Sequence, residues 1–176
     1  LRGGHSGLNI VENRGNALKL VARILSALIE EGVSFDLAGG AGGSKHNAIP
    51  REAEAIVVAD PKATAKLEAV TAVALAAFRI ELAKIDDGLR VSWSPCPDPA
   101  RVLALADRDR LVQLLLALPH GVLAMSPDIP GLVETSSNLA VVNEQDGKIR
   151  IVTSSRSSVA PSLAYVLSQV RAVAAL

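Results

Sequence analysis

The segment KLVARILSALIEEGVSFDL, residues 19–37, carries the pattern on which the fold prediction rests. Its apolar residues recur at positions i, i+3, i+4 and i+7, which is typical of an amphipathic helix with one face against a core. Gly32 lies where a helix C-terminal cap belongs. Residues 33–37 then have the pattern of a short strand, so the segment predicts a helix that leads directly into a sheet.

A second segment, RLVQLLLALPHGVLAM at residues 110–125, resembles the first one. In both, a leucine-rich helix is followed closely by Gly-Val, and then by strands and a further helix. Two interpretations stay open from the sequence. Either the chain holds two similar α-β-β-α units, or two unrelated leucine-rich helices share only their amphipathic pattern.

Further elements follow from local signals. Asp60 before Pro61 is a strong helix start, and Asp146 before Gly147 is a tight turn between two strands. Strands are expected at residues 52–59, 89–93, 122–125, 139–143 and 148–153, helices after Asp60, at about 107–118 and after Ser157 or Ser158, and loops at 39–43 and 94–99. Because these elements lack the strict alternation of a parallel sheet, they predict an α+β fold. Its helices are expected to pack on one face of a mostly antiparallel sheet.

The composition argues against several function classes. Lysine plus arginine equals aspartate plus glutamate, 18 of each, so nothing attracts the chain to nucleic acid or to an anionic membrane surface. Aromatic residues make up only 2%, which argues against a stacking platform for bases. The single cysteine, Cys96, excludes an internal disulfide and a cysteine-based zinc site. No apolar run approaches the roughly 18 residues of a membrane-spanning helix.

The residues by themselves reveal no complete active site. Among the histidines, His5, His46 and His120, no pair has the i, i+4 spacing of a zinc motif. No carboxylate cluster accompanies them with metal-ligand spacing. We interpret His46 and His120 as surface residues.

Three segments together carry a resemblance to a known family. They are GGHSG at residues 3–7, NAIPREA at 47–53, and MSPDIPGLVETSSN at 125–138, which is followed by SRSS at 155–158. In this order and at these distances they resemble the lid, or dimerisation, domain of bacterial aminoacyl-histidine dipeptidases. These enzymes are the carnosinase-like branch of the two-zinc aminoacylase and carboxypeptidase superfamily. The resemblance covers essentially the whole chain and implies a ferredoxin-like lid at residues 1–176.

The resemblance also implies a larger protein around this lid. The lid is expected to lie between the two halves of a zinc catalytic domain, and a first residue, Leu1, that is not methionine agrees with this expectation. The parent is expected to be a cytoplasmic dipeptidase that hydrolyses short peptides such as Xaa-His dipeptides. Two zinc ions, or cobalt or manganese, would be held by the catalytic domain. The fragment would hold no metal and be inactive, and its partners would be the catalytic domain and the dipeptide.

Three residues receive roles from this resemblance. His5 matches the lid histidine that hydrogen-bonds the oxyanion of the tetrahedral intermediate. Asn47 matches an asparagine that contacts the substrate, since its amide can donate to a carboxylate or accept from an amine. Arg156 is expected to bind the C-terminal carboxylate of the dipeptide, because a planar guanidinium suits bidentate capture.

Two alternative functions stay open. The domain could be a self-association module that forms a homodimer, since an isolated lid exposes a strand edge. If the two units are a duplication, that edge could instead be paired within one chain. The domain could also be the lid of a related deacylase or carboxypeptidase, with the same fold and a different substrate. None of these functions involves nucleic acid or a membrane.

Overall fold

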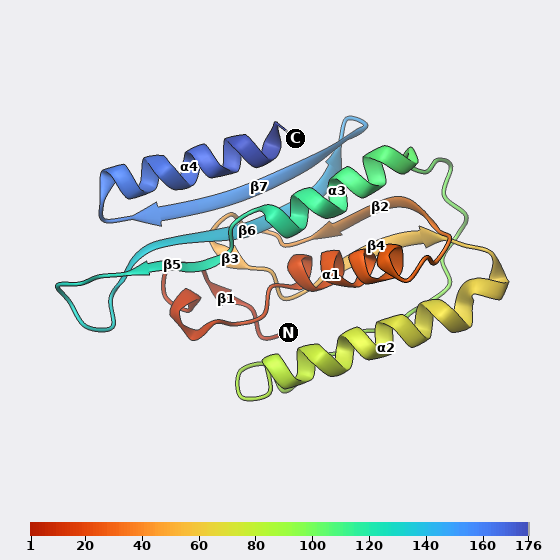
Figure 1. The fold of residues 1–176 in the computed structure, drawn as a ribbon, viewed down its shortest axis with the longest axis horizontal. Helices are drawn as coiled ribbons and strands as arrows, with labels where there is room; N and C mark the ends of the chain where they lie inside the picture. The colour runs from red at the N-terminus through yellow and green to blue at the C-terminus, as the bar shows by residue number, and fades with distance from the viewer. Residues whose placement is uncertain (176) are drawn as a thin grey trace.

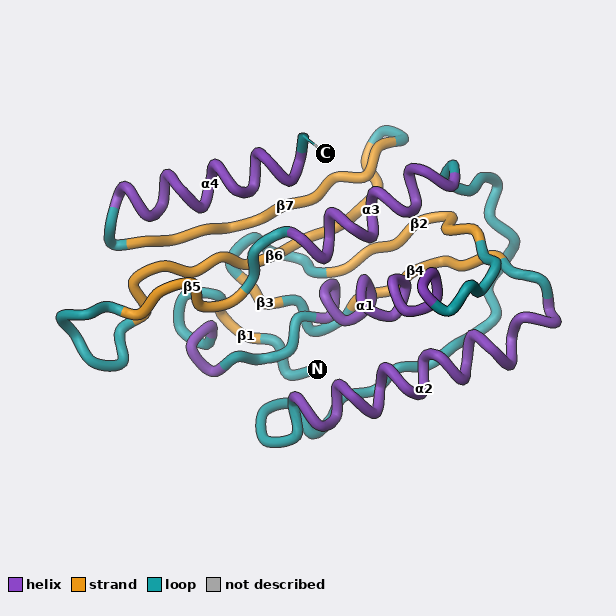
Figure 2. Tube along the Cα trace, in the orientation of Figure 1, coloured by secondary structure: helices purple, strands orange, loops and turns teal. Residues whose placement is uncertain are grey.

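A five-stranded antiparallel sheet forms the frame of the structure, a computed structural model that describes residues 1–175 (Figure 1). Its strands are β2 (Asp36–Gly42), β4 (Ala53–Val58), β5 (Gly121–Met125), β6 (Val133–Gln145) and β7 (Lys148–Ser157). A separate two-stranded sheet pairs β1 (Gly4–His5) with β3 (Ala48–Ile49). The helices, shown in purple in Figure 2, are η1 (Ile10–Glu12), α1 (Ala17–Glu30), η2 (Pro61–Ala63), α2 (Thr64–Glu81), α3 (Leu105–Ala117) and α4 (Ala160–Ala174). Within residues 1–175, no helix is both long enough and apolar enough to cross a membrane.

The long strand β6 joins the parts of the five-stranded sheet. On one edge it pairs with β7 over nearly its whole length. On the other edge it pairs with β5 at one end and with β2 at the other, where Val142 lies opposite Gly42. Strand β4 pairs with β2 and lies at one edge of the sheet, and β7 lies at the opposite edge.

Two α-β-β-α units lie side by side in this sheet. The first is α1, β2, β4 and α2, and the second is α3, β6, β7 and α4, with β5 inserted before β6. Helices α1 and α3 contact each other over the sheet, while α2 and α4 lie toward its two sides in Figure 1. The prediction of an α+β fold with an antiparallel sheet is confirmed, and both units have the predicted order of elements.

The core lies between the helices and one face of the sheet. One buried cluster joins α1, α2 and β2, and it includes Leu28, Leu37 and Phe78. A second cluster joins α1, α3 and β6 through Leu18, Ala22, Leu115, Leu118, Leu139 and Val142. Full burial of one such leucine or phenylalanine contributes roughly 1.5–3 kcal/mol to folding.

The glycine-rich residues 39–43 were predicted to be a loop, and this prediction is wrong because β2 runs through most of them. A Cβ on Gly40 would lie 2.8 Å from the carbonyl oxygen of Glu54, and one on Gly42 would lie 2.7 Å from Leu18 Cδ2. Glycine is therefore needed here for the close approach of β4 and α1. Glycine marks such places as well as turns.

The strand expected at residues 89–93 does not form. This segment belongs to an irregular connection between α2 and α3. Leu89 is buried and Val91 is half-buried, as the alternating pattern predicts, but no strand of the described residues pairs with them.

Most predicted helix ends and turns are confirmed. The side chain of Asp60 accepts the N–H of Lys62 at 2.7 Å at the start of η2. Asp146 and Gly147 both have positive φ, of 52° and 75°, as a tight turn between two strands requires. The last helix begins later than expected, at Ala160, and its N-cap is Val159.

Candidate functional site

His5 lies on β1, at the start of a loop that fixes its backbone. It pairs with Ala48 of β3. Its N–H donates to Asn9 Oδ1 at 2.9 Å, and its carbonyl accepts the N–H of Asn9 at 2.8 Å. Both backbone groups of His5 are therefore held by one residue of the loop, which sets the direction of the side chain.

A polar network supports this loop, and sequence reasoning missed it. Asn9 Nδ2 donates to Glu12 at 2.7 Å, and Arg14 donates to Glu12 at 2.8 Å and to the carbonyl of Gly3 at 2.5 Å. Hydrogen bonds from Arg14, and then from Asn9, lower the pKa of Glu12, so its carboxylate stays ionised at neutral pH. Gly4 has a φ of 154°, and a Cβ there would lie 2.6 Å from Arg14 Nη1. The sequence signal that could have identified this network is the group of polar residues that directly follows the glycine motif.

The imidazole of His5 is held in one tautomer. Its Nδ1 accepts the backbone N–H of Gly7 at 3.0 Å. In a neutral imidazole, the nitrogen that does not accept carries the proton, so Nε2 is the donor. The residue is exposed, which leaves this N–H available to an external acceptor. An oxyanion donor needs this arrangement.

Arg156 of β7 comes to the same loop from the other end of the sequence. In the ladder it lies opposite Ser136 of β6. A Cβ placed on Gly7 would lie 2.8 Å from Arg156 Nη1 and 3.1 Å from His5 Cε1. The guanidinium and the imidazole therefore lie against the same glycine.

Asn47 lies directly before β3 and is half-buried. Its carbonyl accepts the N–H of Ser6 at 2.9 Å, which ties it to the residue after His5. Its side-chain amide forms no hydrogen bond with the residues that the structure describes. The structure thus brings all three sequence-predicted residues to one loop, while their roles stay predictions.

Asn138 of β6 holds the Asn47 loop in place and was not assigned a role from the sequence. It is 1% exposed, and its Nδ2 donates to the carbonyls of Ala48 at 2.8 Å and of His46 at 3.4 Å. Its neighbour Leu139 packs under the helices, so Asn138 points to the opposite face of the sheet. The sequence signal that could have identified Asn138 is an asparagine within a strand that directly follows three residues with hydroxyl side chains. The candidate site therefore lies on the face of the sheet away from the helices.

His120 was interpreted as a surface residue, and this interpretation is wrong. Its Nδ1 lies 3.3 Å from Nδ2 of Asn16, the N-cap of α1. Burial, and then the charge of Lys19, lower the pKa of His120 to about 4. Burial also lowers the pKa of Lys19 to about 8. This cluster joins α1 to α3 and shares no residue with the candidate site.

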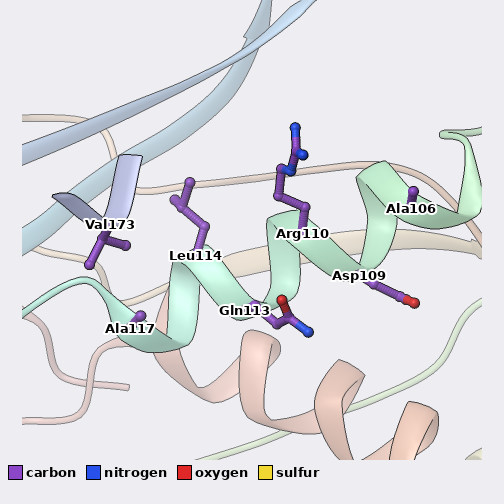
Figure 3. Close-up of a pocket in the computed structure, with 7 residues that line it drawn as sticks. All are labelled: Ala106, Asp109, Arg110, Gln113, Leu114, Ala117 and Val173. Carbon is purple, nitrogen blue, oxygen red and sulfur yellow. The ribbon is translucent and has the colours of Figure 1, made fainter. Parts of the chain in front are cut away.

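Two further possibilities were tested for a reactive centre. Within residues 1–175, no three His, Cys, Asp or Glu side chains gather to hold a metal ion. A cavity of about 330 Å³ lies between α3 and Val173 of α4 (Figure 3). Its charged residues, Asp109 and Arg110, point away from each other in Figure 3, and Asp109 pairs with Arg108 at 2.7 Å. This cavity offers no set of convergent polar groups.

Comparisons with known proteins agree on one relationship. Residues 1–86 match the family described as a peptidase dimerisation domain. The cytosol non-specific dipeptidase of Escherichia coli (strain K12) is 34% identical over 168 residues, which are 96% of this chain and 34% of that protein. The crystal structure of an aminoacylhistidine dipeptidase from Vibrio alginolyticus matches with a TM-score of 0.93 and 34% identity, over 99% of this chain and 35% of that one. The chain therefore spans about a third of the length of the relatives that it matches.

Proposed function

Because residues 1–86 match the family described as a peptidase dimerisation domain and nearly the whole chain is similar in structure to one part of a dipeptidase, we propose that it is a substrate-binding lid. In this proposal residues 1–176 form one domain of a longer dipeptidase. The observation that carries it is the convergence of His5 and Arg156 on Gly7. Both side chains are exposed, and Arg156 forms no ion pair with the described residues.

Each of three lid residues acts on a different part of a bound dipeptide. The Arg156 guanidinium binds the C-terminal carboxylate, and the unpaired Asn47 amide orients the peptide backbone. His5 donates a hydrogen bond from its Nε2–H to the scissile carbonyl oxygen as negative charge develops there. The zinc ions that the resemblance places in the catalytic domain supply an activated water when bound. Closure of the lid by a hinge excludes bulk water from the cleft.

We propose Xaa-His dipeptides as the substrates of the longer protein. The support is the name of the Vibrio alginolyticus relative, while the Escherichia coli relative is named non-specific. A panel of Xaa-His and Xaa-Ala dipeptides would measure this preference. The Escherichia coli relative is named a cytosol dipeptidase, which supports a cytoplasmic location. The chain on its own is expected to be inactive.

Kinetics of single variants in the full-length, zinc-loaded protein test this function. His5→Ala is expected to lower kcat by about 10²–10³-fold with a small change in KM, because it removes a donor used in the transition state. Arg156→Ala is expected to raise KM by about 10–100-fold, because it removes a charged hydrogen bond to the substrate. Asn47→Ala is also expected to raise KM.

Two matched controls accompany these variants. His46→Ala removes an exposed histidine next to Asn47, and Arg150→Ala removes an exposed arginine from the same strand as Arg156. Both are expected to keep the kinetics of the unchanged protein. Normal kinetics in His5→Ala and Arg156→Ala would refute the lid assignment. Activity on acylated amino acids or longer peptides, but not on dipeptides, would assign the lid to a related deacylase or carboxypeptidase.

Self-association is a second candidate function, favoured by strand β7. This ten-residue strand is an outer edge of the sheet and, among residues 1–175, pairs only with β6. The matching family is described as a dimerisation domain, and exposed strand edges pair readily with a second chain. Sedimentation of the full-length protein over a range of concentrations measures this directly. A monomer at every concentration would contradict it.

A further inference from the structure

One buried carboxylate, that of Asp86, joins the two ends of the segment that carries His5. Its Oδ1 accepts the backbone N–H of Arg2 at 2.6 Å, and its Oδ2 accepts the backbone N–H of Gly15 at 2.8 Å. We call these two hydrogen bonds the Asp86 clamp. The residues between them, 3–14, are the His5 segment, which includes β1 and η1. The clamp therefore fixes the points at which this segment begins and ends.

Asp86 is itself fixed to the core. It lies in the turn that follows α2 and is 2% exposed. Its N–H donates to the carbonyl of Leu82 at 2.8 Å, and its carbonyl accepts the N–H of Leu89 at 3.2 Å. Both leucines belong to the first core cluster. The carboxylate therefore offers an immobile acceptor to the two N–H groups that it binds.

The two donors of the clamp distinguish an aspartate from an asparagine of the same shape. With the residues that the structure describes, Asp86 forms no ion pair, and its carboxylate is satisfied by the two backbone N–H groups. A buried charge needs such partners. Asparagine has a single side-chain acceptor oxygen, and its amide nitrogen would face the second N–H donor. Asp86→Asn therefore breaks one side of the clamp with little change in volume.

The turn after α2 contacts both ends of the His5 segment closely. A Cβ on Gly15 would lie 3.3 Å from Asp86 Oδ2, so glycine allows the carboxylate to approach. The residue after Gly15 is the N-cap of α1, which ties this end of the segment directly to a core helix. At the other end, the Arg2 guanidinium donates to the carbonyl of Ile85 at 3.1 Å. Both ends are thus attached to the packed frame of the domain.

A hydrogen bond within the segment extends this constraint toward His5. Arg14, which directly precedes Gly15, donates to the carbonyl of Gly3 at 2.5 Å. Gly3 directly follows Arg2 and leads into β1, on which His5 lies. The clamp and the Arg14 contact together hold the base of the segment closed. A change at the base therefore reaches His5 through a short stretch of backbone.

We propose that Asp86 is a positioning residue for His5. The Asp86 clamp holds the His5 segment so that Nε2–H of His5 is directed at the scissile carbonyl oxygen. This inference rests on the proposed function, in which His5 stabilises the oxyanion. Asp86 forms no hydrogen bond with His5, so it acts through the segment alone. Arg156, which binds the substrate carboxylate in the proposed lid, lies outside the segment, so loss of the clamp affects kcat more than KM.

Kinetics of the full-length, zinc-loaded protein on an Xaa-His dipeptide test this role. Asp86→Asn is expected to lower kcat by about 10–100-fold and to change KM by no more than about twofold. Asp87→Asn alters the exposed neighbouring aspartate and is expected to keep both constants. An unchanged kcat in Asp86→Asn overturns the proposal.

A double variant separates positioning of His5 from general support of the fold. If Asp86 acts through His5, adding Asp86→Asn to His5→Ala is expected to lower kcat no further. A purely structural role would lower kcat by the same factor in both backgrounds, because fewer molecules would be folded. That second result overturns the proposal.

Arg2 provides a second way to break the clamp, from the side of the donor. Arg2→Pro removes the backbone N–H that Asp86 accepts, because proline has none. Arg2→Ala keeps this N–H and removes only the side chain. Arg2→Pro is expected to lower kcat as Asp86→Asn does, and Arg2→Ala is expected to keep it. Equal kcat values in the two variants contradict the clamp.

Amide hydrogen exchange of the full-length protein gives a readout that does not depend on catalysis. Asp86→Asn is expected to speed exchange in residues 3–14 by about tenfold or more, and Asp87→Asn is expected to leave it unchanged. Unchanged exchange in Asp86→Asn overturns the proposal. A full-length protein that hydrolyses no dipeptide would refute the proposed function, and exchange would still decide whether Asp86 holds the segment. An active dipeptidase with normal kcat in Asp86→Asn would refute the role of Asp86 alone.

Discussion

The space beside Gly7 is shared by the side chains of His5 and Arg156, which we propose act on different parts of the substrate. A methyl group there would overlap Arg156 Nη1 and His5 Cε1, which are side-chain atoms and not backbone. Gly7 does not have a positive φ, so the backbone accepts alanine. Gly7→Ala is expected to leave Tm nearly unchanged, and to raise KM and lower kcat of the full-length protein by about tenfold or more.

Gly88→Ala is the matched control for this variant, because nothing lies within 4 Å of a Cβ at that position. It is expected to keep both Tm and the kinetic constants. If Gly7→Ala retains normal kinetics, the two side chains do not need their places against Gly7. If it loses Tm and activity together, the defect lies in folding.

The buried imidazole of His120 makes the stability of the domain depend on pH. Its pKa in the folded chain is about 4, below the value of about 6.5 in an unfolded chain. Between these two values the unfolded chain binds more protons. The free energy of unfolding is therefore expected to fall by up to about 3 kcal/mol as the pH drops from about 6.5 to about 4.

Denaturant titrations of the chain at several pH values measure this dependence. His120→Gln keeps a polar partner for Asn16 without an ionisable ring, and it is expected to flatten the curve in this pH range. His46→Gln, which changes an exposed histidine, is expected to leave the curve unchanged. An equally steep curve in His120→Gln would assign the acid sensitivity to other groups.

At the scale of elements, one lysine joins the two α-β-β-α units. Lys19, in the first turn of α1, donates to the carbonyls of Leu115, Leu116 and Leu118 at the end of α3. Helix ends leave such carbonyls without partners, and a cation there is favourable. Lys19→Met is expected to lower the free energy of unfolding by about 1–3 kcal/mol. Lys66→Met, which removes an exposed cap from α1, is expected to cost about 0.5 kcal/mol or less. Equal losses in the two variants would contradict the bridging role.

The glycines of β2 differ in how closely other atoms approach them. A Cβ on Gly42 would lie 2.7 Å from both Ala53 Cβ and Leu18 Cδ2, whereas nothing lies within 4 Å of a Cβ on Gly39. Gly42→Ala is expected to destabilise the chain by about 1–3 kcal/mol through overpacking. Gly39→Ala is expected to change stability by no more than about 0.5 kcal/mol. Thermal unfolding measures both, and similar values would show that β2 can move away from α1.

The elements that sequence reasoning predicted correctly are those that local patterns determine. Amphipathic periodicity is a property of one segment, and so is a cap such as Asp60 or a turn such as Asp146–Gly147. Strands depend on a partner that lies elsewhere. Residues 39–42 form a strand because β4 approaches them closely, and residues 89–93 form none because no strand lies beside them.

At the scale of the whole molecule, the candidate site combines both ends of the chain. His5 and Asn47 come from the first half, and Arg156 and Asn138 come from the second unit. Sequence motifs identified the first three only through a family resemblance, since no local pattern places Arg156 beside His5. Gly7 and Asn138 were missed because their roles arise from tertiary contacts.

The arrangement of the two units also explains how one chain can build this site. Strands β2 and β6 join the units in one sheet, and the loop that carries Asn47 lies on β6 through Asn138. The site therefore forms within a single chain.

In the proposed lid, Arg156 binds the C-terminal carboxylate of a dipeptide substrate of the full-length protein. The most direct test of this role compares kcat/KM for an Xaa-His dipeptide and for its C-terminal amide, in the unchanged protein and in Arg156→Ala. The unchanged protein is expected to prefer the free acid by about 10–100-fold, and the variant is expected to lose most of that preference. An equally strong preference in both proteins would show that another residue binds the carboxylate, and it would contradict the role proposed for Arg156.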